Sequence, residues 1–330
     1  MNTLHDVITD YSVLEAGYLS REGYIFSSGQ KANIYDAIVI RSPFACNGPG
    51  FRRWPISGHS LEEHIEFINK HQLEYAWIIA EDLSFITRCP SLKYLNISPA
   101  KTAADGFDYS PLYQMPEINS LNATCVQYGP HMERKTSIDL SKIQGLREVR
   151  VMSKGHLHYD RVKTLEVLEL FENKCHRDLR HISCSPLKEL TLTQCSVRTL
   201  AGIEVFDGIQ SLHLYYLRSL EDISELKNVG KSLRALTIQN CPKVKDFGCL
   251  YDLPNLEHLN LEGKNILPNL KFLNNMKKLK TFVFSMEIAD RDIRPCLDIH
   301  CVHMSGRKRD YNLTDKNLPK GKLTEPFKLL

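Results

Sequence analysis

The sequence predicts an α/β solenoid in which each repeat contributes one parallel strand and one short helical segment. The first observation is an apolar hexad, L-x-x-L-x-L, that recurs along the second half of the chain. Its clear copies start at Leu146, Leu165, Leu187, Ile209, Leu233, Leu256 and Leu279. The second observation is the period, because these starts are 19, 22, 22, 24, 23 and 23 residues apart. A fixed short period indicates units that bury their apolar faces only by stacking on their neighbours.

The hexad itself predicts the strand of each repeat. In a strand the alternation L-x-L turns the leucines inward and the residue between them outward. The 22 to 24 residues of a repeat leave room for only a brief helix or 3₁₀ turn. Asp222 and Asp246 stand five residues after Leu217 and Cys241, where a carboxylate can cap such a turn. We therefore expect a leucine-rich repeat solenoid, a horseshoe with a parallel concave sheet and short helical or 3₁₀ convex segments, capped at both ends.

Three weaker hexads precede the clear ones. They start at Leu73, Leu92 and Ile118. The spacing here is irregular, at 19 and 26 residues and then 28 to Leu146, which predicts insertions near Lys101–Met115 and Gln127–Thr136. The total is about ten repeats, spanning residues 73–293.

The two ends of the array carry different signals. Residues 1–72 form an N-terminal cap region, with a strand expected around Ile34–Ile40. This region ends in a helix, because Ser60 and Glu63 form a capping box and Leu61, Ile65 and Ile68 share one helical face. Residues 294–330 hold a C-terminal cap, with a last strand within residues 296–304, and then a basic tail.

Charge and composition limit the classes of partner. The formal net charge is +3, and the residues from Ser305 onward account for +4, which leaves −1 for the rest. This balance argues against a nucleic-acid groove. No apolar run approaches the roughly 20 residues that span a bilayer, and the N-terminus lacks the apolar stretch of a secretory signal. The ten cysteines form no C-x-x-C pair, so we expect free thiols in a reducing, cytoplasmic setting.

A family resemblance follows from the whole repeat. The hexad, a turn, a β-branched or Leu residue, Asp and L-x-x-L are similar to the short leucine-rich repeats of bacterial internalin-like and related cytosolic proteins. The resemblance covers about residues 73–293 and implies the fold rather than an activity. The Asn that usually follows the hexad is present at Asn173, whereas the equivalent positions elsewhere include Cys195, Leu217, Cys241 and Lys264. The chain has no cell-wall sorting signal and no room for the catalytic domain of leucine-rich-repeat ubiquitin ligases, which argues against both of those roles.

The candidate binding residues are the third and fifth residues of each hexad and the residue after it, because these face the concave side. Aromatic residues beside charges are typical of protein-binding hot spots. One aromatic group is at the N-terminal end, where packing against the cap is the alternative role, and the other is central. The predicted partner-binding residues are Trp77, Tyr94, Arg150, Glu169, Phe171, Glu189, His213, Tyr215, Tyr216 and His258.

Motifs for chemistry are missing. The Cys and His clusters, such as Cys175-His176 with His181, lack the paired spacing of zinc ligands, so we predict no metal and no cofactor. No nucleophile-elbow, Walker or dinucleotide-binding motif is present. We predict a monomeric, cytoplasmic, non-enzymatic module that binds a protein, neither nucleic acid nor membrane; its most concrete form is a bacterial immunity protein that neutralises a toxin. The alternatives are an exported effector or a general scaffold, and an enzyme that uses the N-terminal region.

Overall fold

The computed structural model describes residues 37–41, 60–99, 107–123, 138–152, 157–182, 186–206, 208–306 and 310–322. The chain divides into two compact units, Met1–Leu168 (unit 1) and Glu169–Leu330 (unit 2), and each is described by itself. The predicted insertion at Gln127–Thr136, and the part of the other insertion before Phe107, lie outside the described residues.

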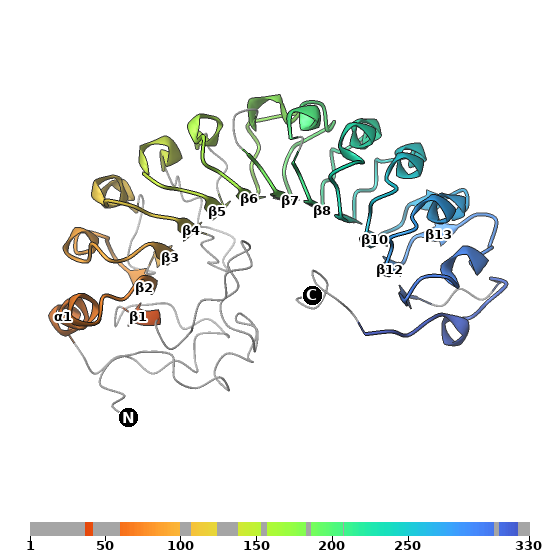
Figure 1. Ribbon diagram of the computed structural model, residues 1–330. Coiled ribbons are helices and arrows are strands. Elements are labelled where there is room, and N and C mark those ends of the chain that lie inside the picture. Colours follow the sequence, from red (N-terminus) through yellow and green to blue (C-terminus); the bar gives the residue numbers. More distant parts are fainter. Residues whose placement is uncertain are drawn as a thin grey trace. The chain divides into compact units, whose positions relative to one another are not determined.

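Unit 1 is a parallel sheet whose strands follow one another in chain order (Figure 1). Its strands are β1 (Ala37–Arg41), β2 (Tyr75–Ala80), β3 (Tyr94–Pro99), β4 (Ser120–Ala123) and β5 (Glu148–Met152). The connections are one α-helix and single 3₁₀ turns: α1 (Leu61–His71), η3 (Ile86–Arg88), η4 (Ser110–Gln114), η5 (Leu140–Lys142) and η6 (Tyr159–Arg161).

Helix α1 has the predicted capping box. The Ser60 hydroxyl accepts a hydrogen bond from the backbone N–H of Glu63 at 3.3 Å, and the Ser60 N–H donates to the Glu63 carboxylate at 2.6 Å. Ile65 and Ile68 are buried as expected, but Leu61 is 40% exposed, because the first residue of the helix lies beyond its packed face. The helix joins β1 to β2, two paired neighbours, so the sheet extends one strand past the element that we expected to close it.

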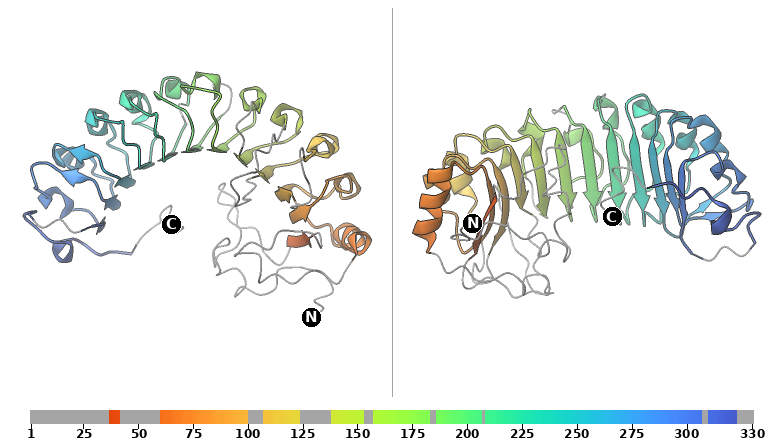
Figure 2. Two further views of the ribbon diagram at one scale, coloured as in Figure 1. Left: turned by 180° about the vertical axis from the view of Figure 1, so that it is seen from behind. Right: turned by 60° about the horizontal axis from the view of Figure 1, so that its bottom comes forward.

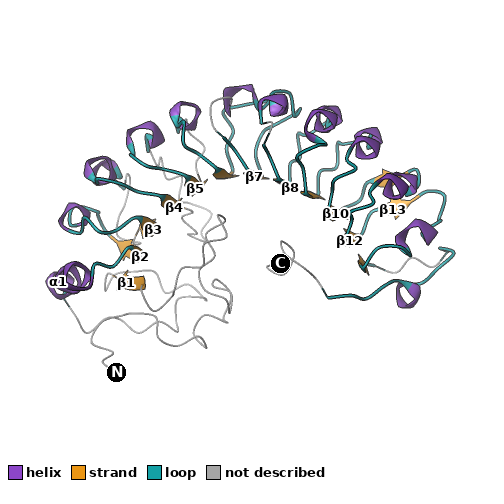
Figure 3. Ribbon diagram, in the orientation of Figure 1, coloured by secondary structure: helices purple, strands orange, loops and turns teal. Residues whose placement is uncertain are grey.

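Unit 2 repeats the same arrangement more regularly (Figure 3). Strand β6 (Val167–Phe171) contains the boundary between the units. The sheet strands after it are β7 (Glu189–Thr193), β8 (Ser211–Tyr215), β9 (Ala235–Gln239), β10 (His258–Glu262), β12 (Thr281–Phe284) and β14 (Cys301–Met304). The 3₁₀ segments are η7 (Arg180–Ile182), η8 (Ile203–Val205), η9 (Ser224–Val229), η10 (Gly248–Asp252), η11 (Lys271–Asn275), η12 (Arg294–Cys296) and η13 (Asp315–Asn317). A separate two-stranded sheet pairs β11 (Ile266–Leu267) with β13 (Glu287–Ile288).

The strands of unit 2 pair without a shift in register, so equivalent hexad positions lie side by side. Leu190 of β7 pairs with Leu212 of β8, and Leu212 pairs with Leu236 of β9. All three leucines are fully buried. The alternation predicted from the hexad is therefore confirmed, and the residues between the leucines form a continuous row on the other face of the sheet.

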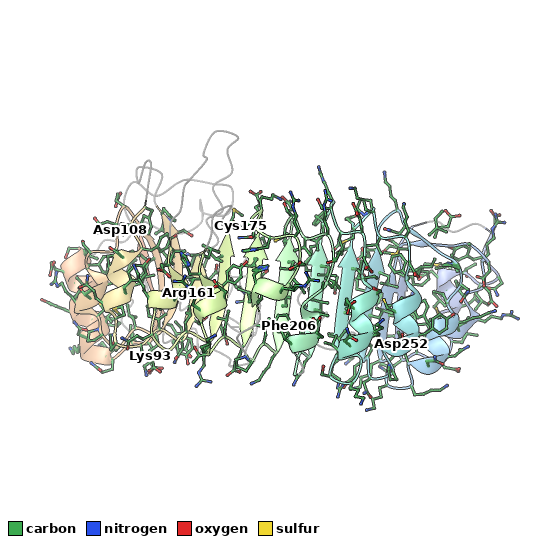
Figure 4. The ribbon with its side chains drawn as sticks, turned by 90° about the horizontal axis from the view of Figure 1, so that it is seen from above. Lys93, Asp108, Arg161, Cys175, Phe206 and Asp252 are labelled. Atoms are coloured by element: carbon green, nitrogen blue, oxygen red, sulfur yellow. The ribbon has the colours of Figure 1, made fainter. Side chains whose placement is uncertain are left out.

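Carboxylates and amides begin the 3₁₀ connections. The Asp222 carboxylate accepts from Ser224 N–H at 2.8 Å and the Asp246 carboxylate accepts from Gly248 N–H at 2.7 Å, which confirms the two predicted caps. The same turn, with the donor two residues on, recurs at Asp82, Asp108, Asp139, Asp178, Asn269 and Asp292. Asp108 and Lys93, which stand after and before β3, lie at opposite edges of unit 1 (Figure 4).

A left-handed residue follows most strands of unit 2. Glu172, Gln194, Tyr216 and Asn240 have φ values of 56°, 55°, 54° and 53°. Each donates its backbone N–H to a carbonyl at the end of the next strand, as Gln194 does to Tyr215 at 2.9 Å. The repeated backbone bond is what holds these non-glycine residues in a costly conformation.

The residue after the left-handed position is buried and forms a rung between repeats. Cys195 and Cys241 occupy this place, and the Cys195 thiol lies 3.4 Å from the carbonyl of Leu170 in the preceding repeat. In the repeat of β10 the rung is Asn265, whose amide donates to the carbonyls of Cys241 and Val244 at 3.0 and 2.8 Å. Counting from the hexad placed Lys264 there; Lys264 is exposed, because the turn after β10 holds one residue more.

The edge of β14 is covered by the chain itself. Val302 N–H donates to the carbonyl of Pro319 at 2.9 Å, and Gly321 N–H donates to the carbonyl of His300 at 3.1 Å. Cys301 and Lys320 form an antiparallel bridge. Backbone groups that would otherwise recruit another strand are thus satisfied within unit 2.

Candidate functional site

The candidate site is the strand face of unit 2, the surface opposite the 3₁₀ segments (Figure 2). It consists of the third and fifth residue of each hexad and the residue after the hexad. In the four consecutive strands β7 to β10 these residues are Glu189, Thr191, Thr193, Ser211, His213, Tyr215, Ala235, Thr237, Gln239, His258, Asn260 and Glu262. The parallel register places them in three rows that run across the strands.

His213 and Tyr215 form the aromatic centre of this face. Their rings are nearly parallel, with centroids 6.2 Å apart and 14° between planes. His213 Nδ1 lies 3.0 Å from Oγ1 of Thr237, its partner in register on β9. Burial lowers the pKa of His213 to about 4, so the imidazole is neutral at physiological pH.

Carboxylates surround Tyr215. Burial raises the pKa of its phenol, a hydrogen bond with Thr237 lowers it, and the charges of Glu169, Glu262 and Glu189 raise it further. Glu262 is in the same row as Tyr215, two strands on, and its carboxylate accepts a hydrogen bond from the Asn260 side-chain amide at 2.8 Å. An ionised tyrosine is therefore disfavoured here, and the phenol is neutral.

The part of the strand face between these groups consists of polar, uncharged side chains. Thr237 and Asn260, adjacent in register, are both fully buried, and Thr191 is 6% exposed. Because these Thr and Asn side chains are short, they project less from the sheet than the neighbouring aromatic rings do. Tyr215 and His213 are accordingly the large side chains at its centre.

Tyr216 follows β8 in the left-handed turn and is 43% exposed. Its backbone N–H donates to the carbonyl of Gln239 at 2.8 Å. The turn thus places a second tyrosine next to Tyr215, at the edge of the face where the strands end.

Cations of unit 2 lie at both edges of these strands. Lys174, Arg218, Lys243 and Lys264 stand in the turns after the strands, and Arg234 and Lys280 stand where strands begin. Lys280 and Arg234 both bond Glu257, with N–O distances of 2.5 and 3.9 Å. These residues occupy the second hexad position, whose side chains are neither in the core nor on the strand face. The pairs are partly exposed, so each stabilises the fold only slightly.

Three further observations on the described residues concern metal binding, membrane insertion and the cysteines. Within the described residues there is no group of three or more His, Cys, Asp or Glu side chains placed to hold a metal ion. In the same part of the chain, no helix is both long and apolar enough to cross a bilayer. Seven described cysteines are free thiols, and burial raises the pKa of Cys195 and of Cys241 to about 11.

The repeat itself decides the type of protein. An L-x-x-L-x-L strand, a left-handed turn, a buried rung and a 3₁₀ connection recur in register along unit 2, and unit 1 has the same strand and connection. The chain is a leucine-rich repeat protein. Its fold class, a long parallel sheet with short 3₁₀ turns, is the one that the hexads predicted.

Comparison with known proteins gives structural likeness only. No protein-family model matches the chain, and no curated protein matches it in sequence. An internalin of Listeria monocytogenes has 17% identity and a TM-score of 0.41, covering 76% of this chain and 73% of that protein. The functional domain of InlJ from the same bacterium, which includes a cysteine ladder, has 16% identity and a TM-score of 0.45, covering 67% of this chain and 49% of that one. A leucine-rich repeat protein of Leptospira interrogans has 16% identity and a TM-score of 0.45, covering 78% and 62%.

The predicted binding residues divide between the two units. Glu169, Phe171, Glu189, His213, Tyr215, Tyr216 and His258 are in unit 2, whereas Trp77, Tyr94 and Arg150 are in unit 1. In unit 1 the rings of Tyr75 and Tyr94 stack at 4.4 Å, with Trp77 two residues along β2. These rings are half-buried, and Trp77 is paired in register with Val39 of β1.

One predicted binding residue is nearly buried, and two residues that act on the aromatic centre of the site were not predicted. His258 is only 7% exposed, so it belongs to the packed part of the face rather than to its contact surface. Thr237 and Glu262 were not among the predicted residues, although Thr237 contacts His213 and the charge of Glu262 acts on Tyr215. The signal was present in the sequence, because both residues occupy outward hexad positions adjacent to the aromatic group.

Proposed function

We propose that this leucine-rich repeat protein is a non-enzymatic interaction module that binds a partner protein through the strand face of unit 2. The observation that supports the proposal best is the cluster of His213, Tyr215 and Tyr216 beside carboxylates on a sheet face that the described chain leaves partly exposed. Aromatic side chains that are already fixed in place lose little entropy on binding. They are the residue types that dominate protein interfaces.

The backbone of this face is held before any partner arrives. Backbone hydrogen bonds join each strand to the next, and rungs such as Asn265 fix the turns at one edge. A face of this kind binds with little rearrangement, which favours tight association.

Capture of partners from a lysate of the source organism tests the proposal. The binding variant is Phe171→Ser with Tyr215→Ser, which removes two aromatic rings and adds no charge. The control variant is Val205→Ser with Ile266→Ser, which removes two side chains that are 47% and 56% exposed, on η8 and β11, off the strand face. Both variants are first compared with the wild type by circular dichroism.

We expect the wild type and the control to retain the same partner and the binding variant to lose it. A single aromatic hot spot typically contributes about 2 kcal/mol or more, which is roughly 30-fold in affinity. Equal capture by the binding variant, or loss of the partner only with the control variant, would contradict the proposed surface.

The finer proposal is that the partner is a toxin and that the chain is a monomeric, cytoplasmic immunity protein of a bacterium. A preformed face binds with little rearrangement, which suits the tight association that neutralising a toxin requires. The test is to express the captured partner alone and together with the chain. Growth arrest by the partner that the chain relieves, and the Phe171→Ser, Tyr215→Ser variant does not, is the expected result. A harmless partner would contradict the immunity role and leave the interaction intact.

A further inference from the structure

We propose that unit 2 has a second interaction surface, the edge at which strands β9, β10, β12 and β14 begin, and that this edge binds an acidic segment of a protein. The proposal goes beyond the proposed function, because the edge is separate from the rows of the strand face. It is carried by charge complementarity, together with exposed lysines on this edge that pair with no described carboxylate.

The backbone of this edge is regular. The first residues of the four strands are paired in register, and they are Ala235, His258, Thr281 and Cys301. The residues just before them are joined in the same order. Glu257 N–H donates to the carbonyl of Arg234, and Lys280 N–H donates to the carbonyl of Glu257, both at 2.8 Å. Equivalent positions of neighbouring repeats are therefore about 4.8 Å apart along the edge.

Cations outnumber carboxylates on this edge and on the 3₁₀ segments beside it. Residues 224–234, 248–257, 271–280 and 294–300 run from the start of each 3₁₀ segment to the start of the next strand. Eight of these residues are cations, namely Lys227, Lys231, Arg234, Lys271, Lys277, Lys278, Lys280 and Arg294. Four are carboxylates, namely Glu225, Asp252, Glu257 and Asp298. An acidic segment therefore meets a positive field at this edge.

The residues that border the edge change this balance little. Arg294 is offset by Asp292, to which it is bonded at 2.6 Å. Lys322 adds a cation, because it follows Gly321, whose N–H donates to the carbonyl of His300. Towards β8 the charge ends, since the residue before that strand is Gln210.

Glu257 shows how this edge holds a carboxylate. Its side chain bonds Lys280 Nζ at 2.5 Å and lies 3.9 Å from Arg234 Nε. The hydrogen bond from Lys280 and the charges of Lys280 and Arg234 lower the pKa of Glu257, against a smaller opposing effect of burial. The edge thus stabilises an ionised carboxylate.

The lysines next to this pair have no carboxylate of their own. Lys231, Lys277 and Lys278 are exposed, and none of them forms an ion pair within the described part of the chain. Pro254 and Asn255, which hold the positions of Lys277 and Lys278 in the β10 repeat, are uncharged. Because single exposed ion pairs are weak, binding here depends on several adjacent pairs formed at once.

The other residues of the edge favour a protein segment over a nucleic acid. Leu297 holds the position of Lys277 in the β14 repeat and is 45% exposed, so the edge also offers apolar contact. Asp298 holds the position of Lys278 in that repeat. A nucleic-acid strand presents a phosphate about every 3.4 Å and would set one against this carboxylate. An acidic protein segment can place an apolar side chain there.

The test is fluorescence anisotropy with the 330-residue chain and a fluorescein-labelled octa-glutamate peptide. The edge variant is Lys277→Gln with Lys278→Gln. The matched control is Lys245→Gln with Lys264→Gln, two exposed lysines in the turns after β9 and β10, at the opposite ends of the strands. Asp298→Asn removes a carboxylate from the edge. A fluorescein-labelled oligonucleotide of eight thymidines is the second probe.

We expect the edge variant to raise the Kd for octa-glutamate about 5-fold or more and the control less than about 2-fold. In about 0.1 M salt the Debye length is about 10 Å, and a five-residue strand of about 16 Å separates the two ends. Asp298→Asn should lower the Kd about 2-fold. Equal effects of the edge variant and the control would overturn the inference. So would tighter binding of the thymidine oligonucleotide than of octa-glutamate, or no binding of octa-glutamate.

The variant Phe171→Ser with Tyr215→Ser separates this inference from the proposed function. It should bind octa-glutamate as tightly as the wild type does, because its substitutions are on the strand face. Weaker binding of octa-glutamate by this variant would place the peptide on the strand face and overturn the inference. Failure of the proposed function appears instead as equal capture of the natural partner by this variant and the wild type.

Discussion

His213 and Thr237 are neighbours in register on β8 and β9, with Nδ1 of the imidazole 3.0 Å from the threonine hydroxyl. Thr237 is fully buried, so the histidine is set against the sheet rather than extended into solvent. Burial of His213 at this place on the sheet lowers its pKa and so links the stability of unit 2 to pH.

The His213 prediction follows from its lowered pKa. The folded-state pKa is about 4 and the ordinary value is 6.5, so between these values the unfolded chain binds a proton that the folded chain does not. The contribution of His213 to the free energy of unfolding is therefore fully present above about pH 6.5 and is lost as the pH falls toward 4. Urea unfolding at pH 7 and 4.5 should show that wild type loses about 2 kcal/mol more than His213→Gln. Replacement of the exposed His300 by Gln is the control, and equal pH dependence in wild type and His213→Gln would refute the assignment.

The turn caps give a second prediction. Asp246→Ala removes the 2.7 Å bond to Gly248 N–H and should lower the free energy of unfolding by about 1 kcal/mol. Asp252→Ala, at an exposed position in the same connection, should stay within about 0.5 kcal/mol of wild type. Thermal and urea unfolding measure both. Equal losses would mean that the cap has no specific role.

The left-handed residues give a third prediction. Gln194 has a φ of 55° and is exposed, so Gln194→Gly relieves backbone strain without removing packing. We expect a gain of about 0.5 to 1 kcal/mol, because the left-handed conformation costs a residue with a Cβ more than it costs glycine. Gln194→Val should lose stability, since β-branched residues tolerate this region least. A valine variant as stable as the glycine variant would contradict the assigned backbone.

The thiols differ in accessibility, which gives a fourth prediction. Cys175 is exposed, whereas Cys195 and Cys241 are buried rungs with pKa values of about 11. Iodoacetamide at pH 8 should label Cys175 within minutes and the two rungs only on unfolding, because the thiolate is the reactive form. Mass spectrometry of peptides after timed quenching identifies each residue. Labelling of the rungs at the rate of Cys175 would show that these turns open readily.

The strands could be predicted from the sequence because the alternation of apolar residues in each hexad determines which side chains face the core. All ten predicted hexads overlap a strand, and the inward apolar positions, such as Leu190 and Leu212, are buried as the alternation requires. The caps at Asp222 and Asp246 were predictable for a similar reason, since a turn needs an acceptor at a fixed place before its N–H groups.

Counting positions from the hexad did not predict features that depend on the length of a turn or on the neighbouring strand. Asn265 replaces Lys264 as the rung because the turn after β10 is one residue longer, and the spacing of the hexads does not reveal this. His258 is buried because it lies in register between Ala235 and Thr281, whose side chains are small. The periodicity of one repeat does not encode the size of the residues beside it.

The most direct test of the central claim is photo-crosslinking of the partner from defined positions. A benzoylphenylalanine residue replaces Tyr215 on the strand face in one protein, and Tyr251 in the other. Tyr251 is 42% exposed and lies on η10, on the side of the connections. The account predicts that the partner crosslinks to position 215 and not to position 251. Crosslinking at position 251 alone, or equally at both positions, would contradict binding through the strand face of unit 2.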